Sequence, residues 1–424
     1  MIISTTEKNK WQKGKTIAKE GIAISFGEEK QSIRGFGTCF SELGAIALNR
    51  LSPKEKKELL DELFTEEGAN FNYCRTPIGA SDFATDFYSY NETDGDYEME
   101  NFSIDRDRKL LLPLIKEALS RQADMQMFAS PWCPPLWLKT IKVYSNGIFN
   151  ATPENFKAYA LYFKKYVEAY HNEGVPIIHI HPQNEPCSNQ VFPSCVWSGE
   201  MLTRFIGDYL GEALEGTGVD IFYGTVNGPE GDDRWTRTRY HQYLGYAMQD
   251  EKARKYIKGV GYQWAGKMAL GATHDDYPEL ELIQTESECG GGDNSWAQMM
   301  YIFEMMRMYI REGASAYVYW NIALEGDSAS TWGWKQKSLI TVTKDGDYRY
   351  NPDFYVIKHF ARFVREGAVM LKTKGGWSTN ATLFRNPDGS TVAVVMNPFD
   401  FEKDLTLEGQ TFRIPARSFA TVLF

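Results

Sequence analysis

The sequence predicts an α/β protein, a (β/α)8 TIM barrel with a side β-sandwich domain built from both termini. Two patterns predict this fold. Apolar β-type runs alternate with amphipathic helical stretches through the middle of the chain, and both ends carry short alternating segments separated by turn signals. The 424 residues are enough for a barrel of roughly 250 residues or more and a smaller domain.

The middle of the chain contains as many strand-like runs as a closed parallel barrel needs. Each run is short and apolar, and a loop and a helical stretch separate it from the next, which is typical of repeated βα units. The predicted strands are 33–40, 71–75, 125–130, 176–181, 220–224, 259–264, 281–285 and 316–320. The predicted helices are 53–64, 107–121, 153–173, 199–214, 236–247 and 295–312.

The two ends of the chain predict the sandwich. Residues 11–26 and 376–424 alternate polar and apolar positions between turn signals such as Asn-Pro-Asp-Gly at 386–389. Segments 391–396 and 419–424 are predicted to be antiparallel strands with one buried face. We therefore expect a structural sandwich domain over 1–30 and 366–424, a catalytic barrel over 31–365, and a linking helix at 352–365.

Composition and charge narrow the class of partner. The chain is 43% hydrophobic and 24% charged, as in soluble enzymes, and its formal net charge of −10 argues against a nucleic-acid partner. We expect no integral membrane segment because no run of about 18 apolar residues occurs. The N-terminus lacks the features of a signal peptide, which favours a cytoplasmic protein, or a secreted one if a leader has been trimmed. The oligomeric state is left open.

The six cysteines indicate reduced thiols rather than a disulfide scaffold. They form no CxxC pair, and their density is low for a stapled secreted fold. Cys187 and Cys195 are close enough in sequence to bridge one loop, so they are the expected pair if any disulfide forms.

Two carboxylates stand at the predicted C-terminal ends of strands, where barrel enzymes place their active sites. One β-branched run ends in Asn184-Glu185-Pro186, and another ends at Glu286. Two carboxylates at one barrel mouth are what retaining glycoside hydrolysis requires. Glu288 would share the face of Glu286 on a longer strand, but the glycines at 290–292 indicate that the strand has ended, so Glu286 is favoured.

Motifs along most of the chain resemble glycoside hydrolase family 30, the glucosylceramidase-like O-glycosyl hydrolases. They are 34–37 (Arg-Gly-Phe-Gly), 75–83 (Arg-Thr-Pro-Ile-Gly-Ala-Ser-Asp-Phe), 129–139 (Ala-Ser-Pro-Trp-Cys-Pro-Pro-Leu-Trp-Leu-Lys), 184–186 (Asn-Glu-Pro), 285–286 (Thr-Glu) and 319–324 (Tyr-Trp-Asn-Ile-Ala-Leu). The resemblance implies a retaining mechanism, carboxyl groups about 5 Å apart, and no metal or organic cofactor. It makes Glu185 the general acid/base and Glu286 the nucleophile.

The same resemblance implies that Asp82, Trp132, Asn184 and Trp320 bind the sugar. A carboxylate such as Asp82 accepts hydrogen bonds from sugar hydroxyls, and indole rings offer flat apolar faces. Their alternative interpretations are a loop acid for Asp82 and core aromatics for the two tryptophans.

Two further residues complete the predicted site. Arg75 is expected to pair with a catalytic carboxylate and keep Glu286 ionised, or else to form a salt bridge at the bottom of the barrel. Family members often carry His-x-Tyr at the end of the sixth strand, where this chain has Tyr262-Gln263-Trp264. The indole N–H of Trp264 is therefore expected to replace the tyrosine that commonly donates to the nucleophile.

The sequence thus predicts a β-glycosidase acting on a β-linked glycoside or oligosaccharide, with β-glucose as the first choice and a glucosylceramidase-like activity. β-Xylosidase, β-fucosidase and β-1,6-glucanase activities are alternatives on the same scaffold, and exo or endo action is left open. A remote alternative is a metal-dependent barrel hydrolase that uses His179 and His181, which share one face of a strand.

Overall fold

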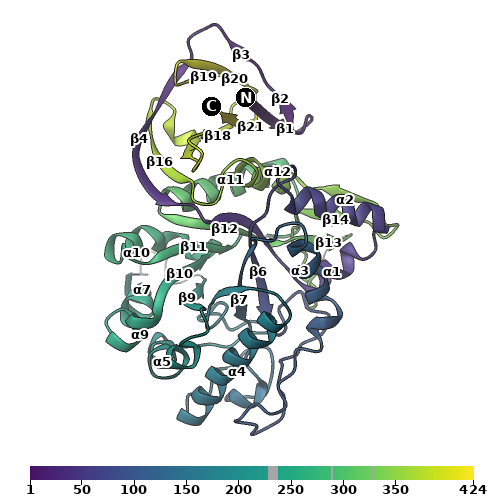
Figure 1. The fold of residues 1–424 in the computed structure, drawn as a ribbon, viewed down its shortest axis with the longest axis vertical. Coiled ribbons are helices and arrows are strands. Elements are labelled where there is room, and N and C mark those ends of the chain that lie inside the picture. The colour runs from purple at the N-terminus through teal and green to yellow at the C-terminus, as the bar shows by residue number, and fades with distance from the viewer. Residues whose placement is uncertain (228–236, 288–289, 327–328) are drawn as a thin grey trace.

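The computed structural model describes residues 1–227, 237–287, 290–326 and 329–424. Within these residues, eight parallel strands close into a barrel, and each predicted strand is confirmed with its ends shifted by at most three residues (Figure 1). The strands are β5 (Gly35–Cys39), β6 (Tyr73–Ile78), β7 (Gln126–Pro131), β8 (Ile177–Ile180), β9 (Asp220–Val226), β10 (Ile257–Gln263), β11 (Glu281–Glu286) and β12 (Ala314–Asn321). Strand β12 pairs with β5 to close the ring.

Helices surround the barrel, and local sequence signals fix several of their starts. Ser52 and Glu55 form a capping box at the start of α2, and Thr152 and Ser295 cap α4 and α11. The α-helices are α1 (Glu42–Leu48), α2 (Pro53–Phe64), α3 (Leu111–Leu119), α4 (Pro153–Asn172), α5 (Gly199–Phe205), α6 (Gly211–Leu214), α7 (Arg237–Gln242), α8 (Leu244–Ala247), α9 (Glu251–Tyr256), α10 (Leu270–Asp276), α11 (Trp296–Arg311) and α12 (Pro352–Ala361). The shorter helical turns are η1 (Asp107–Lys109), η2 (Leu136–Leu138), η3 (Ile206–Leu210), η4 (Trp264–Ala269) and η5 (Ser378–Asn380).

The prediction of one continuous helix over 236–247 is wrong. Its first residue lies outside the described residues, and the rest forms α7 and α8 with a break at Tyr243. At this break the carbonyl of Gln242 lies so close to Gly199 that a β-carbon there would come within 1.7 Å of its oxygen. The hydroxyl of Tyr243 also donates to the carbonyl oxygen of Trp197 at 2.9 Å. Packing against α5 therefore coincides with the break.

A ten-stranded sheet beside the barrel combines strands from both ends of the chain, which confirms the predicted sandwich. Its order is β2 (Gln12–Lys13), β1 (Ile2–Thr6), β21 (Ser418–Leu423), β18 (Thr391–Asn397), β17 (Ala381–Arg385), β16 (Val369–Gly375), β4 (Ile22–Ser32), β19 (Lys403–Leu407), β20 (Gln410–Ile414) and β3 (Thr16–Ile17). The predicted strands near 391–396 and 419–424 are β18 and β21, and they pair antiparallel. Both termini consequently lie together in this domain (Figure 1). A small third sheet contains β13 (Ala323–Glu325), β14 (Ile340–Val342) and β15 (Tyr348–Tyr350).

Helices α11 and α12 lie between the barrel and the sandwich (Figure 1). Phe419 of β21 packs 5.0 Å from the ring of Phe303 in α11, measured between ring centroids. His359 of α12 is buried between the hydroxyls of Thr5 and Thr421, at 2.9 and 2.8 Å, and burial lowers its pKa to about 3. A neutral imidazole therefore ties the helix to both terminal strands.

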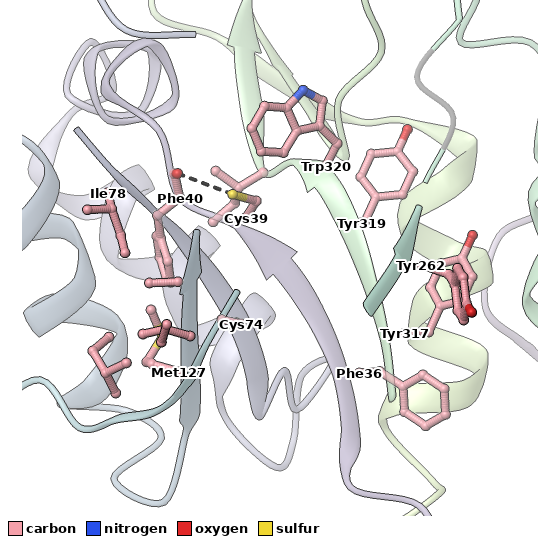
Figure 2. Close-up of a cluster of buried hydrophobic side chains, with 14 of the residues drawn as sticks. Phe36, Cys39, Phe40, Cys74, Ile78, Met127, Tyr262, Tyr317, Tyr319 and Trp320 are labelled. Carbon is pink, nitrogen blue, oxygen red and sulfur yellow. Dashed lines mark hydrogen bonds between the residues drawn. The ribbon is translucent and has the colours of Figure 1, made fainter. Parts of the chain in front are cut away.

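The barrel interior is filled with side chains rather than open. Tyr73, Phe128, Phe222, Ile283 and Val318 form one buried cluster inside it. In β12, Tyr317 and Tyr319 lie on one side of the strand and Trp320 lies on the other (Figure 2). This alternation follows from the two-residue period of a strand.

The cysteines and the helices settle two smaller expectations. Cys195 is a free, buried thiol, so the loop bridge between Cys187 and Cys195 is not formed. In the part of the chain that the structure describes, no helix is long and apolar enough to cross a membrane.

Replacing Phe419 with Ala should weaken the packing between the sandwich and the barrel. Phe419 is 1% exposed, so truncation leaves a cavity and should lower the free energy of unfolding by about 3–5 kcal/mol. Urea denaturation followed by tryptophan fluorescence measures this loss. Phe401→Ala is the matched control, because Phe401 is an exposed sandwich residue and its removal should change stability little. An equal effect of the two variants would contradict the interface.

Candidate active site

A cavity of about 190 Å³ opens at the C-terminal mouth of the barrel. Its wall contains acids, amides and aromatic rings, which is a typical composition for a site that binds a polyhydroxylated ring. The lining residues are Asp82, Trp132, Glu185, Gln190, Phe192, Asn227, Trp264, Glu286, Gly290, Trp334 and Gln336. Five predicted site residues therefore line one cavity, whereas Arg75, Asn184 and Trp320 are not among the lining residues.

Arg75 lies at the centre of the polar network beneath this cavity. It projects from β6, is 0% exposed, and its Nη1 donates to Glu286 Oε2 at 3.0 Å. Its Nη2 donates to Ser130 Oγ at 2.7 Å and to Asn184 Oδ1 at 2.6 Å. The guanidinium also lies 4.5 Å from the ring centroid of Trp132. Of the two arrangements expected for Arg75, it adopts the pair with Glu286 at the mouth.

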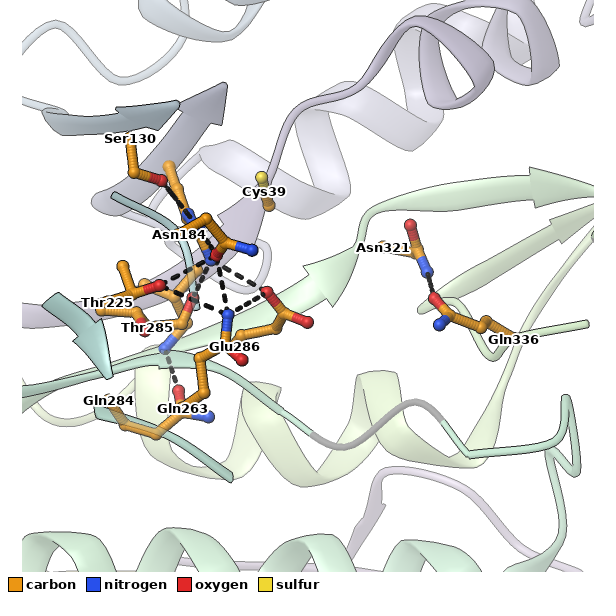
Figure 3. A network of polar contacts seen from close by, with 12 residues as sticks. Cys39, Ser130, Asn184, Thr225, Gln263, Gln284, Thr285, Glu286, Asn321 and Gln336 are labelled. Carbon is orange, nitrogen blue, oxygen red and sulfur yellow. Dashed lines mark hydrogen bonds and ion pairs between the residues drawn. The ribbon is translucent and has the colours of Figure 1, made fainter. Parts of the chain in front are cut away.

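Asn184 is held in one orientation by three donors. Its Oδ1 accepts from Arg75, from Thr225 Oγ1 at 2.8 Å and from Gln263 Nε2 at 2.8 Å. The amide nitrogen therefore lies on the side away from these donors (Figure 3). A flipped amide would place N–H groups against N–H groups, so the network itself assigns the orientation.

Glu185 follows Asn184 in an unusual backbone conformation. Its φ of 50° lies in the left-handed region, and its backbone N–H donates to the carbonyl oxygen of Thr225 at 3.0 Å. Such strain in a non-glycine residue occurs often at functional sites, where the surrounding structure fixes it. Within the described residues, its buried Oε2 has no hydrogen-bond partner.

Glu286 ends β11 and is bound from two sides. Besides the ion pair with Arg75, its Oε2 accepts from Gln263 Nε2 at 3.0 Å. The prediction that Trp264 supplies the donor from the sixth barrel strand is therefore corrected, because the amide of the preceding residue, Gln263, occupies that position and Trp264 lines the cavity. Gln263 was missed because a buried glutamine at a strand end has no distinguishing sequence signal. Glu288 lies outside the described residues.

The surroundings of the two glutamates separate their pKa values. Burial raises the pKa of Glu185 above its usual range, and the negative charges of Glu286 and Asp82 raise it further. Burial also raises the pKa of Glu286, but Arg75 opposes that effect through its charge and its hydrogen bond. Glu185 consequently retains its proton to higher pH than Glu286.

Asp82 and the predicted aromatic pair lie on another side of the cavity. Burial raises the pKa of the Asp82 carboxyl, and the charge of Glu286 adds to this shift. Trp132 lines the cavity and stacks on Trp320, with ring centroids 5.2 Å apart and planes inclined by 23°. Trp320 does not line the cavity and therefore acts as a packing partner of Trp132.

Several lining residues were not predicted, namely Gln190, Phe192, Asn227, Gly290, Trp334 and Gln336. They come from loops, where no strand period marks the direction of a side chain. The Asn184-Glu185-Pro186 motif could have indicated Gln190 and Phe192, because the loop that follows Glu185 has to start at the cavity.

The two strand histidines serve packing. The ring of His179 stacks on Phe222 with centroids 4.0 Å apart, and its Nε2 lies 2.5 Å from the hydroxyl of Tyr73. His181 is also buried, and desolvation lowers the pKa of both imidazoles. Among the described residues, no three His, Cys, Asp or Glu side chains gather as a set of metal ligands. The geometry thus offers no support for the metal-dependent alternative.

Comparison with known proteins identifies related chains. A family model described as the glycosyl hydrolase family 30 TIM-barrel domain matches residues 33–364, and one described as the glycosyl hydrolase family 30 beta sandwich domain matches residues 367–422. The chain is 28% identical over 417 residues to the lysosomal acid glucosylceramidase of Mus musculus, covering 91% of this chain and 79% of the relative. It is 26% identical over 394 residues to the endo-1,6-beta-D-glucanase BGN16.3 of Trichoderma harzianum, covering 87% and 78%.

Solved structures share the whole architecture. The structure of SrfJ from Salmonella typhimurium superposes with a TM-score of 0.88 at 24% identity, covering 100% of this chain and 98% of that one, which shows a common fold. The endo-beta1,6-glucanase BT3312 superposes with a TM-score of 0.89 at 25% identity, covering 99% and 98%.

Replacing Arg75 with Met should destabilise the protein strongly because it leaves Glu286 buried without its cation. We expect a loss of about 3–5 kcal/mol in the free energy of unfolding at pH 7, measured by urea denaturation. The loss should be smaller at pH 5. Without Arg75 the pKa of Glu286 in the folded protein rises further above its value in the unfolded chain. A carboxyl with a raised pKa in the folded state destabilises the fold increasingly as the pH rises, because its ionised form is disfavoured there.

Arg413→Met serves as the matched control. Arg413 forms an exposed ion pair with Asp404 in the sandwich, which solvent screens, so the variant should unfold almost like the unmodified protein. A similarly small, pH-independent effect of Arg75→Met would show that Arg75 does not neutralise Glu286.

Proposed function

The chain belongs to glycosyl hydrolase family 30, as its motifs predicted, and on that premise we propose that it is a retaining β-glucosidase. Membership makes it a glycoside hydrolase with a glycan substrate. In the proposed reaction Glu185 is the general acid/base and Glu286 is the nucleophile. The observation that carries the proposal is the unequal environment of two buried glutamates on one cavity.

The contacts of the two acids support these roles. Glu286 lies against a guanidinium and an amide N–H, which favour the ionised form that attacks the anomeric carbon. Glu185 has a buried oxygen without a hydrogen-bond partner among the described residues and a more strongly raised pKa, as required of an acid that carries a proton at neutral pH. Both groups line the same small cavity.

The reaction then proceeds by two displacements. Glu286 forms a bond to the anomeric carbon as the glycosidic bond breaks, and Glu185 gives its proton to the departing oxygen. A water molecule next transfers a proton to Glu185 and attacks the anomeric carbon, which breaks the bond to Glu286. The sugar leaves with its β configuration, and both glutamates return to their starting protonation states.

Four of the other predicted residues are assigned to the sugar in the cavity. The outward Nδ2 of Asn184 is suited to donate to a hydroxyl beside the anomeric carbon, because its Oδ1 is occupied by three donors. Asp82 is suited to accept from hydroxyls at the far end of the ring. Trp132 and Trp264 supply apolar surface for the faces of the ring.

β-Glucose is the proposed sugar, and two relatives support it. The mouse relative is named a glucosylceramidase and the Trichoderma relative an endo-1,6-beta-D-glucanase, so both names denote substrates that contain glucose. An endo-1,6-β-glucanase is the second candidate, favoured by the superposition of BT3312 over 99% of this chain. β-Xylosidase and β-fucosidase activities are further outcomes of the same substrate panel.

Turnover of a panel of 4-nitrophenyl β-glycosides shows which sugar is cleaved, and variants of the two glutamates test their catalytic roles. Glu286→Ala should lower kcat by more than about 10⁴-fold, and azide should restore turnover with release of the α-glycosyl azide. Glu185→Ala should lose about 10²- to 10⁴-fold on substrates with poor leaving groups and much less on activated ones.

Glu288→Ala is the control for these variants, and it should retain activity. Azide rescue of Glu288→Ala in place of Glu286→Ala would reassign the nucleophile. Activity on long β-1,6-glucan alone, with no turnover of small glycosides, would favour the endo candidate.

The pH dependence of kcat/KM tests the part played by Gln263. Activity should rise as Glu286 loses its proton and fall as Glu185 loses its own, which gives a bell-shaped profile. Gln263→Met removes a hydrogen bond to the ionised form of Glu286, so the pKa of Glu286 should increase by about one unit. The acid limb should move to higher pH while the alkaline limb stays in place. An unchanged acid limb would contradict this contribution.

A further inference from the structure

We propose that the cavity mouth beside Glu185 is a binding site for a second sugar ring, formed mainly by Trp334, Phe192 and Gln190, so that the group released is a saccharide rather than a lipid chain. This inference rests on the proposed function and deepens it. We call these three residues the mouth wall.

The position of the mouth wall follows from the role of Glu185. A general acid that protonates the departing oxygen has to lie beside the leaving group. Gln190 and Phe192 belong to the loop that follows Glu185 directly, and both line the cavity. The mouth wall therefore stands on the leaving-group side, whereas Asp82 and Trp132 come from the β6 and β7 ends.

Trp334 stands out as an exposed tryptophan that is nevertheless held firmly. It is 46% exposed and lines the cavity. A tight turn fixes its backbone, since Ser330 N–H donates to Trp334 O at 2.8 Å and Trp334 N–H donates to Ser330 Oγ at 3.2 Å. Trp332 joins it to the other loop, with ring centroids 4.9 Å from Trp334 and 5.4 Å from Phe192. A large, exposed indole beside a catalytic cavity is suited to stack on a ligand.

A buried lysine anchors the loop that carries Gln190 and Phe192. Lys139 is 3% exposed, and its ammonium group donates to the carbonyl oxygens of Val143, Asn146 and Ser194 at 2.6, 2.6 and 2.8 Å. The hydroxyl of Ser194 in turn accepts from Gln190 N–H at 3.1 Å. The loop is thus ordered before any ligand binds, which reduces the entropy lost on binding.

The chemistry of the mouth favours a sugar over an alkyl chain. Gln190 and Gln336 place amide groups among the aromatic rings. Asn227 adds a third side-chain amide to the lining of the cavity. Sugar hydroxyls both donate and accept, and a sugar face stacks on an indole. An alkyl chain would cover these three amide side chains without bonding to them, which is unfavourable.

Trp334→Ala tests the mouth wall by a selective loss. Its kcat/KM should fall about 5- to 10-fold for β-1,6-, β-1,3- or β-1,4-linked glucose disaccharides, the loss expected for one aromatic stacking contact. It should change less than twofold for β-glucosyl fluoride, whose leaving group has no ring, and for octyl β-glucoside. Phe401→Ala, an exposed aromatic variant in the sandwich, should leave every substrate unaffected.

Two results would overturn the inference. An equal loss on glucosyl fluoride and on disaccharides would mean that Trp334 acts on the first sugar or on the fold. A larger loss on octyl β-glucoside than on disaccharides would assign the wall to an alkyl chain. Thermal unfolding of each variant shows whether the fold is retained.

Measurements of disaccharide binding distinguish a failure of this inference from a failure of the proposed function. If the unmodified protein does not hydrolyse glucosyl fluoride, the β-glucosidase proposal fails. The mouth wall is then tested by calorimetric titration of the Glu286→Gln variant with the disaccharides. Introducing Trp334→Ala into that variant should weaken disaccharide binding about 5- to 10-fold and leave glucose binding unchanged. Equal disaccharide affinities with and without Trp334→Ala would refute the proposed binding site.

Discussion

The ion pair between Arg75 and Glu286 is the interaction on which the rest of the site depends. A guanidinium at 0% exposure is tolerated because it has a carboxylate, a hydroxyl and an amide oxygen as acceptors and lies over an indole ring. These partners come from three different barrel strands or strand ends, those of β7, β8 and β11. Closing the barrel is therefore what completes the coordination of the charge, and the charge in turn fixes where the strand ends and their side chains lie.

From this single cation the two glutamates acquire different properties. Arg75 and Gln263 stabilise charge on Glu286, whereas no donor from the part of the chain that the structure describes reaches Oε2 of Glu185 in the same buried space. Two identical side chains thus favour opposite protonation states at one pH. The left-handed backbone at Glu185, held by its bond to Thr225, places the acid while Asn184 beside it stays locked in the network.

The loops add a second level of organisation around this network. The turn that carries Trp334 is also hydrogen-bonded to the segment that carries Asp82, because Thr331 N–H donates to the carbonyl oxygen of Asp82 at 3.1 Å. Lys139 secures the loop on the Glu185 side. One rigid frame thus holds the residues assigned to the sugar in the cavity and the residues of the mouth wall. The sandwich packs beside the barrel against α11 and α12.

The sequence by itself determined the barrel, the terminal sandwich, the family and the two strand-end glutamates, because strand periodicity and local motifs are properties of neighbouring residues. It also placed Asp82, Trp132 and Trp264 at what proved to be one cavity. Only the tertiary structure decided that Gln263 donates to Glu286, that Trp320 stands behind Trp132, and that Gln190, Phe192 and Trp334 share a wall. Those contacts join residues far apart in the chain, and their geometry depends on barrel closure and loop packing, which leave no periodic signal in the sequence.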